Sequence, residues 1–106
     1  MNIDTLEKMI ADGKDGAMLR LTLARLLAAD QRLDEAAAHL QQAVELEADY
    51  TAAWKELGRV HAERGDDAAA ESAWLRGTEV AQANGDKQAE REMGVFLKRL
   101  RRRRES

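Results

Sequence analysis

The residues with the clearest potential for metal chemistry are two histidines, His39 and His61. The run His61-Ala62-Glu63 matches the His-x-Glu of zinc deaminases, but those enzymes also need cysteine ligands, and this chain has no cysteine. A zinc site needs three or four protein ligands at matched spacing, and two isolated histidines do not supply them. We therefore predict packing or solvated roles for both histidines, with no metal and no cofactor.

Catalytic patterns of other kinds are missing from the sequence as well. Phosphate-binding loops of the types G-x-x-x-x-G-K-[ST] and G-x-G-x-x-G do not occur, nor does the nucleophile elbow G-x-S-x-G. Asp66 and Asp67 are adjacent carboxylates, but they follow Gly65 and are expected to begin a helix. Because no nucleophile, base and orienting group can be grouped, the chain is predicted not to be an enzyme.

Charge is distributed unevenly along the chain. Residues 1–97 hold 11 bases and 19 acids, a net −8, whereas residues 98–106 hold six bases and one acid, a net +5. Basic runs bind phosphates, so this end suggests one alternative function, binding of nucleic acid or an anionic surface through the arginine run. No aromatic side chain follows Phe96 to stack on bases, so we expect the arginines to be mainly structural and solubilising.

The segments that must position these side chains all read as helices. Apolar residues recur at spacings of three and four between short polar breaks, which predicts helices over 2–12, 16–30, 33–47, 51–64, 67–83 and 86–103. No alternating run is long enough for a strand, so the expected fold class is all-α. The N-terminal stretch lacks the apolar run of a secretory signal, and no segment is long enough to span a membrane. A cytoplasmic location is the expectation.

A shift of 34 residues reveals an internal repeat. Residues 17–50 fall on residues 51–84 with small residues on small ones and large apolar residues on large apolar ones. The second copy carries a W-x2-L-G signature followed by an A-x3-W pair, and the first copy matches it more weakly. The signature positions in both copies are Leu23, Ala24, Ala36, Leu40, Trp54, Leu57, Gly58, His61, Ala70 and Trp74.

This pattern resembles the tetratricopeptide-repeat family. The match has departures: His61 stands where the family usually has tyrosine, Arg20 where it has tryptophan, and neither copy has the closing proline. The resemblance implies a short solenoid of antiparallel helix pairs with about six helices, in one domain over 1–106. Its parts would be an N-terminal capping helix (1–16), repeat 1 (17–50), repeat 2 (51–84) and a C-terminal capping helix with a basic tail (85–106).

Gly58 is the residue whose conformational cost most needs an explanation. Glycine inside a helix costs about 1 kcal/mol relative to alanine. We therefore expect Gly58 at a close crossing of the two helices of a pair, facing Ala70, with Leu57, His61 and Trp74 around it. Gly65 is expected to take the left-handed conformation that ends a helix.

The resemblance also places a binding surface. In this family the first helix of each pair lines a concave face that binds partners. By register, that face would hold Met18, Leu21, Thr22, Arg25, Lys55, Glu56, Arg59, Ala62 and Glu63. Arg25 and Arg59 share a repeat position, and with Lys55 they are expected to form a cationic stripe.

The function implied is a non-catalytic protein–protein interaction module, an adaptor or small chaperone-like protein that binds an unidentified protein or peptide segment on the concave face. The family's groove for a terminal carboxylate uses asparagines, and the first helices here have none, so that ligand is not expected. A further alternative is an oligomeric scaffold subunit that uses the incomplete repeats at its ends. We expect a monomer or a homodimer.

Overall fold

The computed structural model describes residues 2–105, which form α-helices joined by short turns. The helices are α1 (Ile3–Ala11), α2 (Ala17–Ala29), α3 (Leu33–Leu46), α4 (Thr51–Glu63), α5 (Asp67–Asn84) and α6 (Lys87–Glu105). No strand occurs within this range. The all-α prediction is confirmed, and each predicted helix ends within two residues of the observed bounds. None of the helices in the described range is long and apolar enough to cross a membrane.

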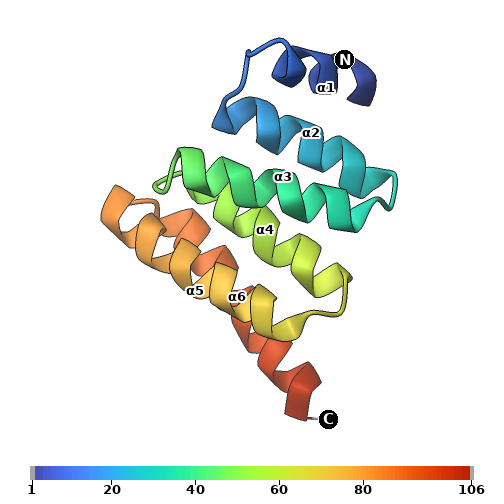
Figure 1. Ribbon diagram of the computed structural model, residues 1–106. Coiled ribbons are helices and arrows are strands. Elements are labelled where there is room, and N and C mark those ends of the chain that lie inside the picture. The colour runs from blue at the N-terminus through green and yellow to red at the C-terminus, as the bar shows by residue number, and fades with distance from the viewer. Residues whose placement is uncertain (1, 106) are drawn as a thin grey trace.

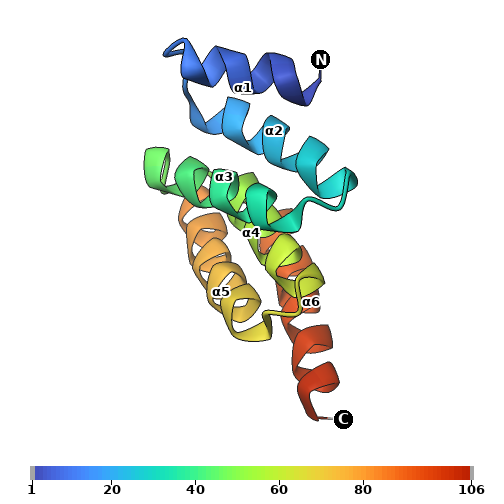
Figure 2. The ribbon, with the colours of Figure 1, turned by 45° about the vertical axis from the view of Figure 1, so that its right-hand side comes forward.

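The helices stack in chain order, from α1 at the blue end to α6 at the red end (Figure 1). Each helix packs against the next one along the chain, and α4 additionally contacts α2 and α6. The stack is elongated, with extents of 44 × 31 × 19 Å (Figure 2). The three helices α2, α4 and α6 therefore form one continuous layer, as expected of a tetratricopeptide-like solenoid.

The helices α2 and α4 end with the same geometry. Gly65 after α4 has φ 82° and Gln31 after α2 has φ 61°, so both residues are left-handed. The next amide N–H then donates to a carbonyl five residues back, from Asp66 to His61 at 2.9 Å and from Arg32 to Leu27 at 2.9 Å. The turn predicted at Gly65 is observed, and its equivalent in the other pair forms without glycine.

The start of α5 shows the role of its two aspartates. The Asp66 carboxylate accepts a hydrogen bond from the amide of Ala69 at 3.1 Å, which caps the helix. Asp67 is the first residue of the helix, where a negative charge is favourable. The adjacent carboxylates therefore begin a helix, as predicted.

The core is built largely from the repeat positions. Eight of the ten signature residues are buried, and Trp54 and His61 are half-buried. The large side chains with essentially no exposure are Leu6, Leu23, Leu27, Leu40, Val60 and Met93. Leu6 of α1 and Met93 of α6 show that the flanking helices are packed into the same kind of core as the central pairs.

Gly58 lies at a close contact, as expected, and of its predicted neighbours the one that faces it is Trp74, not Ala70. A Cβ at this position would lie 2.3 to 2.6 Å from atoms of the Trp74 indole. The indole N–H donates to the Lys55 carbonyl at 3.0 Å, which holds the ring over the glycine. The expectation that Gly58 faces Ala70 is therefore wrong, because the space above the glycine is filled by an aromatic ring.

Gly77 is a second glycine at a close contact, and the repeat signature did not single it out. A Cβ on Gly77 of α5 would lie 2.6 Å from the Met93 sulfur and 3.0 Å from the Trp54 Cβ. The 34-residue register places Gly77 on Ala43, which is fully buried. A small residue at this repeat position was thus visible in the sequence, as a signal for a second close crossing.

Candidate partner-binding groove

A groove runs between the C-terminal half of α2 and the middle and end of α4, and we call it the α2–α4 groove. Its volume is about 470 Å³. Its lining residues are Arg25, Ala28, Ala29, Gln31, Lys55, Glu56, Arg59, Val60 and Glu63. The structure thus brings together five of the predicted binding residues and adds small or polar neighbours that the register did not single out.

The other predicted residues of α2 lie elsewhere. Met18 is near the start of the helix and is 72% exposed, and Thr22 donates its hydroxyl to the Met18 carbonyl at 3.0 Å. Leu21 was expected on the concave face but is buried. It shares the inward side of α2 with Ala17 and Ala24, at the spacing of four and three that marks one helical face.

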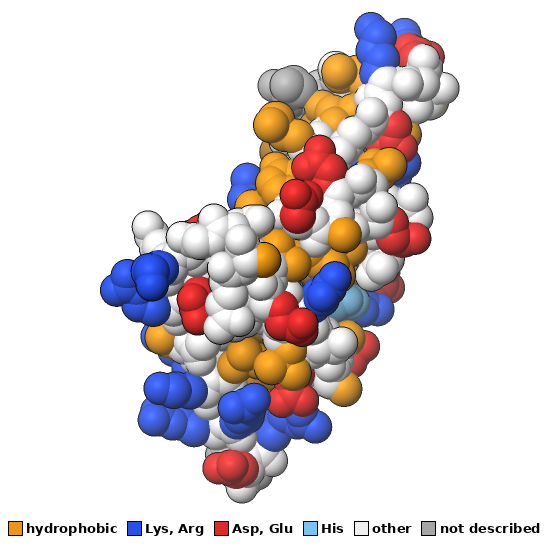
Figure 3. Space-filling view, turned by 90° about the vertical axis from the view of Figure 1, so that its left-hand side faces the viewer, with side chains coloured by type: hydrophobic (Ala, Val, Ile, Leu, Met, Phe, Trp, Pro, Cys, Tyr) orange, Lys and Arg blue, Asp and Glu red, His pale blue; other side chains and the backbone are white. Residues whose placement is uncertain are grey.

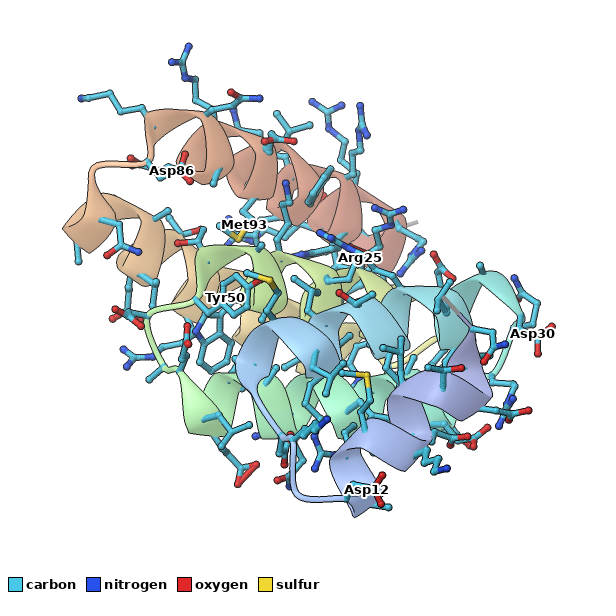
Figure 4. The ribbon with its side chains drawn as sticks, turned by 90° about the horizontal axis from the view of Figure 1, so that it is seen from above. Asp12, Arg25, Asp30, Tyr50, Asp86 and Met93 are labelled. Atoms are coloured by element: carbon cyan, nitrogen blue, oxygen red, sulfur yellow. The ribbon has the colours of Figure 1, made fainter. Side chains whose placement is uncertain are left out.

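Glu56 is the carboxylate that pairs with the arginines of the groove. It is buried, yet its carboxylate lies 3.5 Å from Arg25 Nε and 3.5 Å from Arg59 Nη1. Figure 4 shows Arg25 on the layer that α2 shares with α4 and α6. The carboxylate therefore links two arginines that occupy the same position in successive first helices.

The predicted cationic stripe is accordingly wrong. Arg59 also lies 4.0 Å from Glu63, and Lys55 turns toward α6, where its Nζ is 3.6 Å from Glu92. Glu56 precedes Arg59 by three residues, which places the two side chains on one helical face. The groove therefore carries alternating charges and not a row of cations.

This arrangement leaves hydrogen-bonding capacity toward solvent. The side chains of Arg25 and Arg59 are 53% and 60% exposed, and each guanidinium has five N–H donors. Each guanidinium directs a single nitrogen to Glu56, so a bound carboxylate or backbone carbonyl can accept from the remaining donors. The groove is suited to a ligand rich in acceptors.

A smaller depression continues the same face between α4 and α6. It has a volume of about 230 Å³ and is lined by Thr51, Ala52, Lys55, Asp86, Gln88, Ala89 and Glu92. Lys55 lines both this depression and the α2–α4 groove. One surface therefore extends across all three first helices.

The histidines lie away from the groove, and each contacts an arginine. His39 Nδ1 is 3.0 Å from Arg20 Nη1, and His61 Nδ1 is 3.1 Å from Arg64 Nη1. Burial lowers the pKa of both imidazoles, and the neighbouring guanidinium lowers each pKa further. Within residues 2–105 no three metal-ligating side chains are grouped so that they could hold an ion.

Arg20 itself bridges three elements at the position where the family has tryptophan. It donates two hydrogen bonds to Asp15, from Nε at 2.8 Å and from Nη2 at 2.7 Å. The hydrogen bond with Arg20 is the main reason that the pKa of Asp15 is lowered. Arg20 thereby ties the loop before α2 to His39 on α3.

The basic tail continues helix α6 and pairs with the first turns of α5. Arg103 pairs with Asp67, and Glu71 pairs with Arg101 at 3.7 Å and with Arg104 at 3.6 Å. Figure 3 shows basic side chains gathered at the end of the molecule where α6 finishes. Much of the arginine run is therefore compensated by acidic residues of the same chain.

Sequential antiparallel helices in a 34-residue register, with a continuous face of first helices, define a helical-repeat protein of the solenoid class. No family model matches the sequence. It is 46% identical over 100 residues to the TPR repeat-containing protein PA0015 of Pseudomonas aeruginosa, across 94% of this chain and 95% of that protein. The solution structure of protein BPP2914 from Bordetella parapertussis is similar, with a TM-score of 0.82 and 40% identity over 95% of this chain and 88% of that one. The chain belongs to the tetratricopeptide-repeat family.

Proposed function

We propose that this protein is a non-catalytic interaction module that binds a peptide or an extended protein segment along the face of α2, α4 and α6. The observation that supports this most is the α2–α4 groove, where exposed arginine donors surround a buried carboxylate. An extended segment presents backbone carbonyls and side-chain acceptors at regular intervals. Solenoids of this class use such surfaces for protein partners.

Two other functions receive less support from the structure. Nucleic-acid binding through the tail would have to displace the pairs that Arg101, Arg103 and Arg104 make with α5. An oligomeric scaffold would need a contiguous apolar surface at the ends of the stack. Within residues 2–105, the exposed large apolar side chains instead lie on four different helices, as Met18, Leu46, Leu75 and Val95.

The test compares affinity capture by the parent protein and by the double variant Lys55→Glu with Arg59→Glu, both tagged at the same end. Reversing these charges is expected to remove the partner, because both side chains line the groove. The matched control is Arg76→Glu with Lys8→Glu, which reverses two charges on α5 and α1, outside the groove. Circular dichroism and urea unfolding establish that every variant is folded.

The milder double variant Lys55→Gln with Arg59→Gln guards against misfolding caused by new repulsion with Glu56 and Glu92. A partner retained by the parent and the control, but lost from both groove variants, supports the proposal. A partner that binds the groove variants with unchanged affinity would place the binding surface elsewhere.

A further inference from the structure

A separate small cavity lies between the end of α4, the middle of α5 and the C-terminal half of α6, and we call it the α6 slot. Its volume is about 210 Å³, room for one large side chain. Its lining residues are Ala62, Trp74, Phe96, Arg99, Leu100 and Arg103. Four of these six residues are apolar, in contrast to the charged lining of the α2–α4 groove.

The inner wall of the slot is aromatic and offers no free polar group. The rings of Trp74 and Phe96 are 5.3 Å apart between centroids and tilted by 42°. The only polar atom of the indole already donates to the Lys55 carbonyl. A polar occupant would lose its hydrogen bonds to water without replacement, so the slot favours an apolar side chain.

The rim of the slot is cationic, and its two arginines differ. Arg103 is paired with Asp67. Arg99 is exposed, and within residues 2–105 it takes part in no hydrogen bond or ion pair. The slot therefore combines an apolar wall with one guanidinium that is available to an incoming carboxylate.

The slot is adjacent to the groove. Ala62 lines the slot, and its neighbour Glu63 lines the α2–α4 groove, so the two cavities flank the last turn of α4.

We propose that the α6 slot receives one aromatic or large aliphatic side chain of the bound segment, and that Arg99 pairs with an acidic residue beside it. This inference rests on the proposed function, and it narrows the partner to an acidic segment with an apolar anchor. The aromatic wall supplies the apolar contact, and Arg99 supplies charge complementarity.

The probes are three blocked peptides: acetyl-Gly-Asp-Phe-Asp-Gly-amide, the same peptide with alanine for phenylalanine, and the same peptide with lysines for the aspartates. The readout is the indole N–H signal of Trp74 in a proton–nitrogen NMR spectrum, assigned by comparison with Trp54→Phe. Trp54 is an internal reference because it lies outside the slot and its indole donates to the Ala48 carbonyl at 2.8 Å.

The acidic phenylalanine peptide is expected to shift the Trp74 signal saturably and to leave the Trp54 signal in place. The alanine and lysine peptides should bind at least about tenfold more weakly, since the first lacks the apolar anchor and the second lacks the carboxylates that pair with Arg99. Arg99→Glu should weaken the first peptide by a similar factor. Lys98→Glu is the matched control, because it makes the same charge change one residue earlier, outside the slot.

Three results would overturn the inference. The first is an unmoved Trp74 signal up to the solubility limit of the peptide. The second is an equal loss of affinity in Arg99→Glu and Lys98→Glu, which would mean general electrostatic attraction. The third is a Trp74 signal that moves with protein concentration alone, which would place a second copy in the slot. Any of them leaves the capture test of the α2–α4 groove intact, so the failures of the two proposals are distinguishable.

Discussion

The helix pairs α2–α3 and α4–α5 fill equivalent positions with different side chains. In the first pair, Ala24 and Leu40 are both fully buried. In the second pair the equivalent residues are Gly58 and Trp74, and the indole occupies the space that a Cβ at position 58 would take. The space left by the missing side chain of Gly58 on α4 is filled by the larger ring of Trp74 on α5. The two residue types therefore compensate each other in volume.

The same comparison explains the odd arginine of the first pair. Arg20 and Trp54 hold equivalent positions, and each anchors its helix to the loop that precedes it. Arg20 does so through two hydrogen bonds to the Asp15 carboxylate, and Trp54 through its indole N–H to the Ala48 carbonyl. One pair uses an ionic contact where the other uses a neutral one, so the first pair is the one sensitive to acid at this point.

The largest effect is expected from Gly58→Leu. The new side chain collides with the Trp74 indole, and we expect the free energy of unfolding to fall by about 3 kcal/mol in urea titrations. Gly94→Ala is the control, because a Cβ there meets no atom within 4 Å and α6 should gain about 0.5–1 kcal/mol. A Gly58→Leu protein as stable as the parent would show that the close contact is not formed.

A moderate effect is expected from Arg20→Ala. The change removes the two hydrogen bonds that Arg20 donates to Asp15, and we expect a destabilisation of about 1 kcal/mol after allowance for solvent screening. Arg32→Ala serves as the control, since Arg32 makes a similar two-bond contact with Glu35 on an exposed surface and should matter little. Equal losses in the two variants would contradict a bridging role for Arg20.

Two substitutions at the left-handed turns are expected to change the stability by smaller amounts and in opposite directions. Gln31 is left-handed without being glycine, so Gln31→Gly should stabilise the protein by up to about 1 kcal/mol. The reciprocal change Gly65→Gln in the other pair should destabilise it by a similar amount. Thermal unfolding of both variants measures the difference, and shifts of the same sign would refute the equivalence of the two turns.

The smallest effect concerns pH. Burial lowers the pKa of His39 and His61 in the folded protein, so the unfolded chain binds more protons near the ordinary histidine pKa of 6.5. Stability should therefore be complete above about pH 7 and decline as the pH falls through about 6.5. His39→Gln with His61→Gln should flatten the profile between pH 7 and 5, because glutamine can still accept from the neighbouring arginine. An unchanged slope would assign the decline to other groups.

The sequence alone supports the helix bounds and the repeat, because both depend on local spacing. It also marks Gly58 and Trp74, whose types are unusual for a helix core. It places Trp74 near Gly58, but it does not reveal that the ring itself covers the glycine, since that depends on the rotamer and on a hydrogen bond to the Lys55 carbonyl.

The features of the groove that the sequence does not predict are the contacts between helices. Register alone placed Arg25 and Arg59 on one face, but it treated their charges as unpaired. Glu56 on α4 pairs with both arginines. Its contact with Arg25 depends on the distance between α2 and α4, which the register does not give. Leu21 was misplaced for a similar reason, because the helical rotation that buries it is set by packing against neighbouring helices.

The central claim is that the two helix pairs are versions of one packing unit, and a double-mutant cycle on Gly58→Ala and Trp74→Leu tests it most directly. Each single change should be destabilising, the first by crowding the ring and the second by leaving a cavity. Together they recreate the alanine and leucine of the first pair, so urea unfolding should show the double variant at least about 1 kcal/mol more stable than the sum of the single effects predicts. Additivity within about 0.5 kcal/mol would contradict the claim.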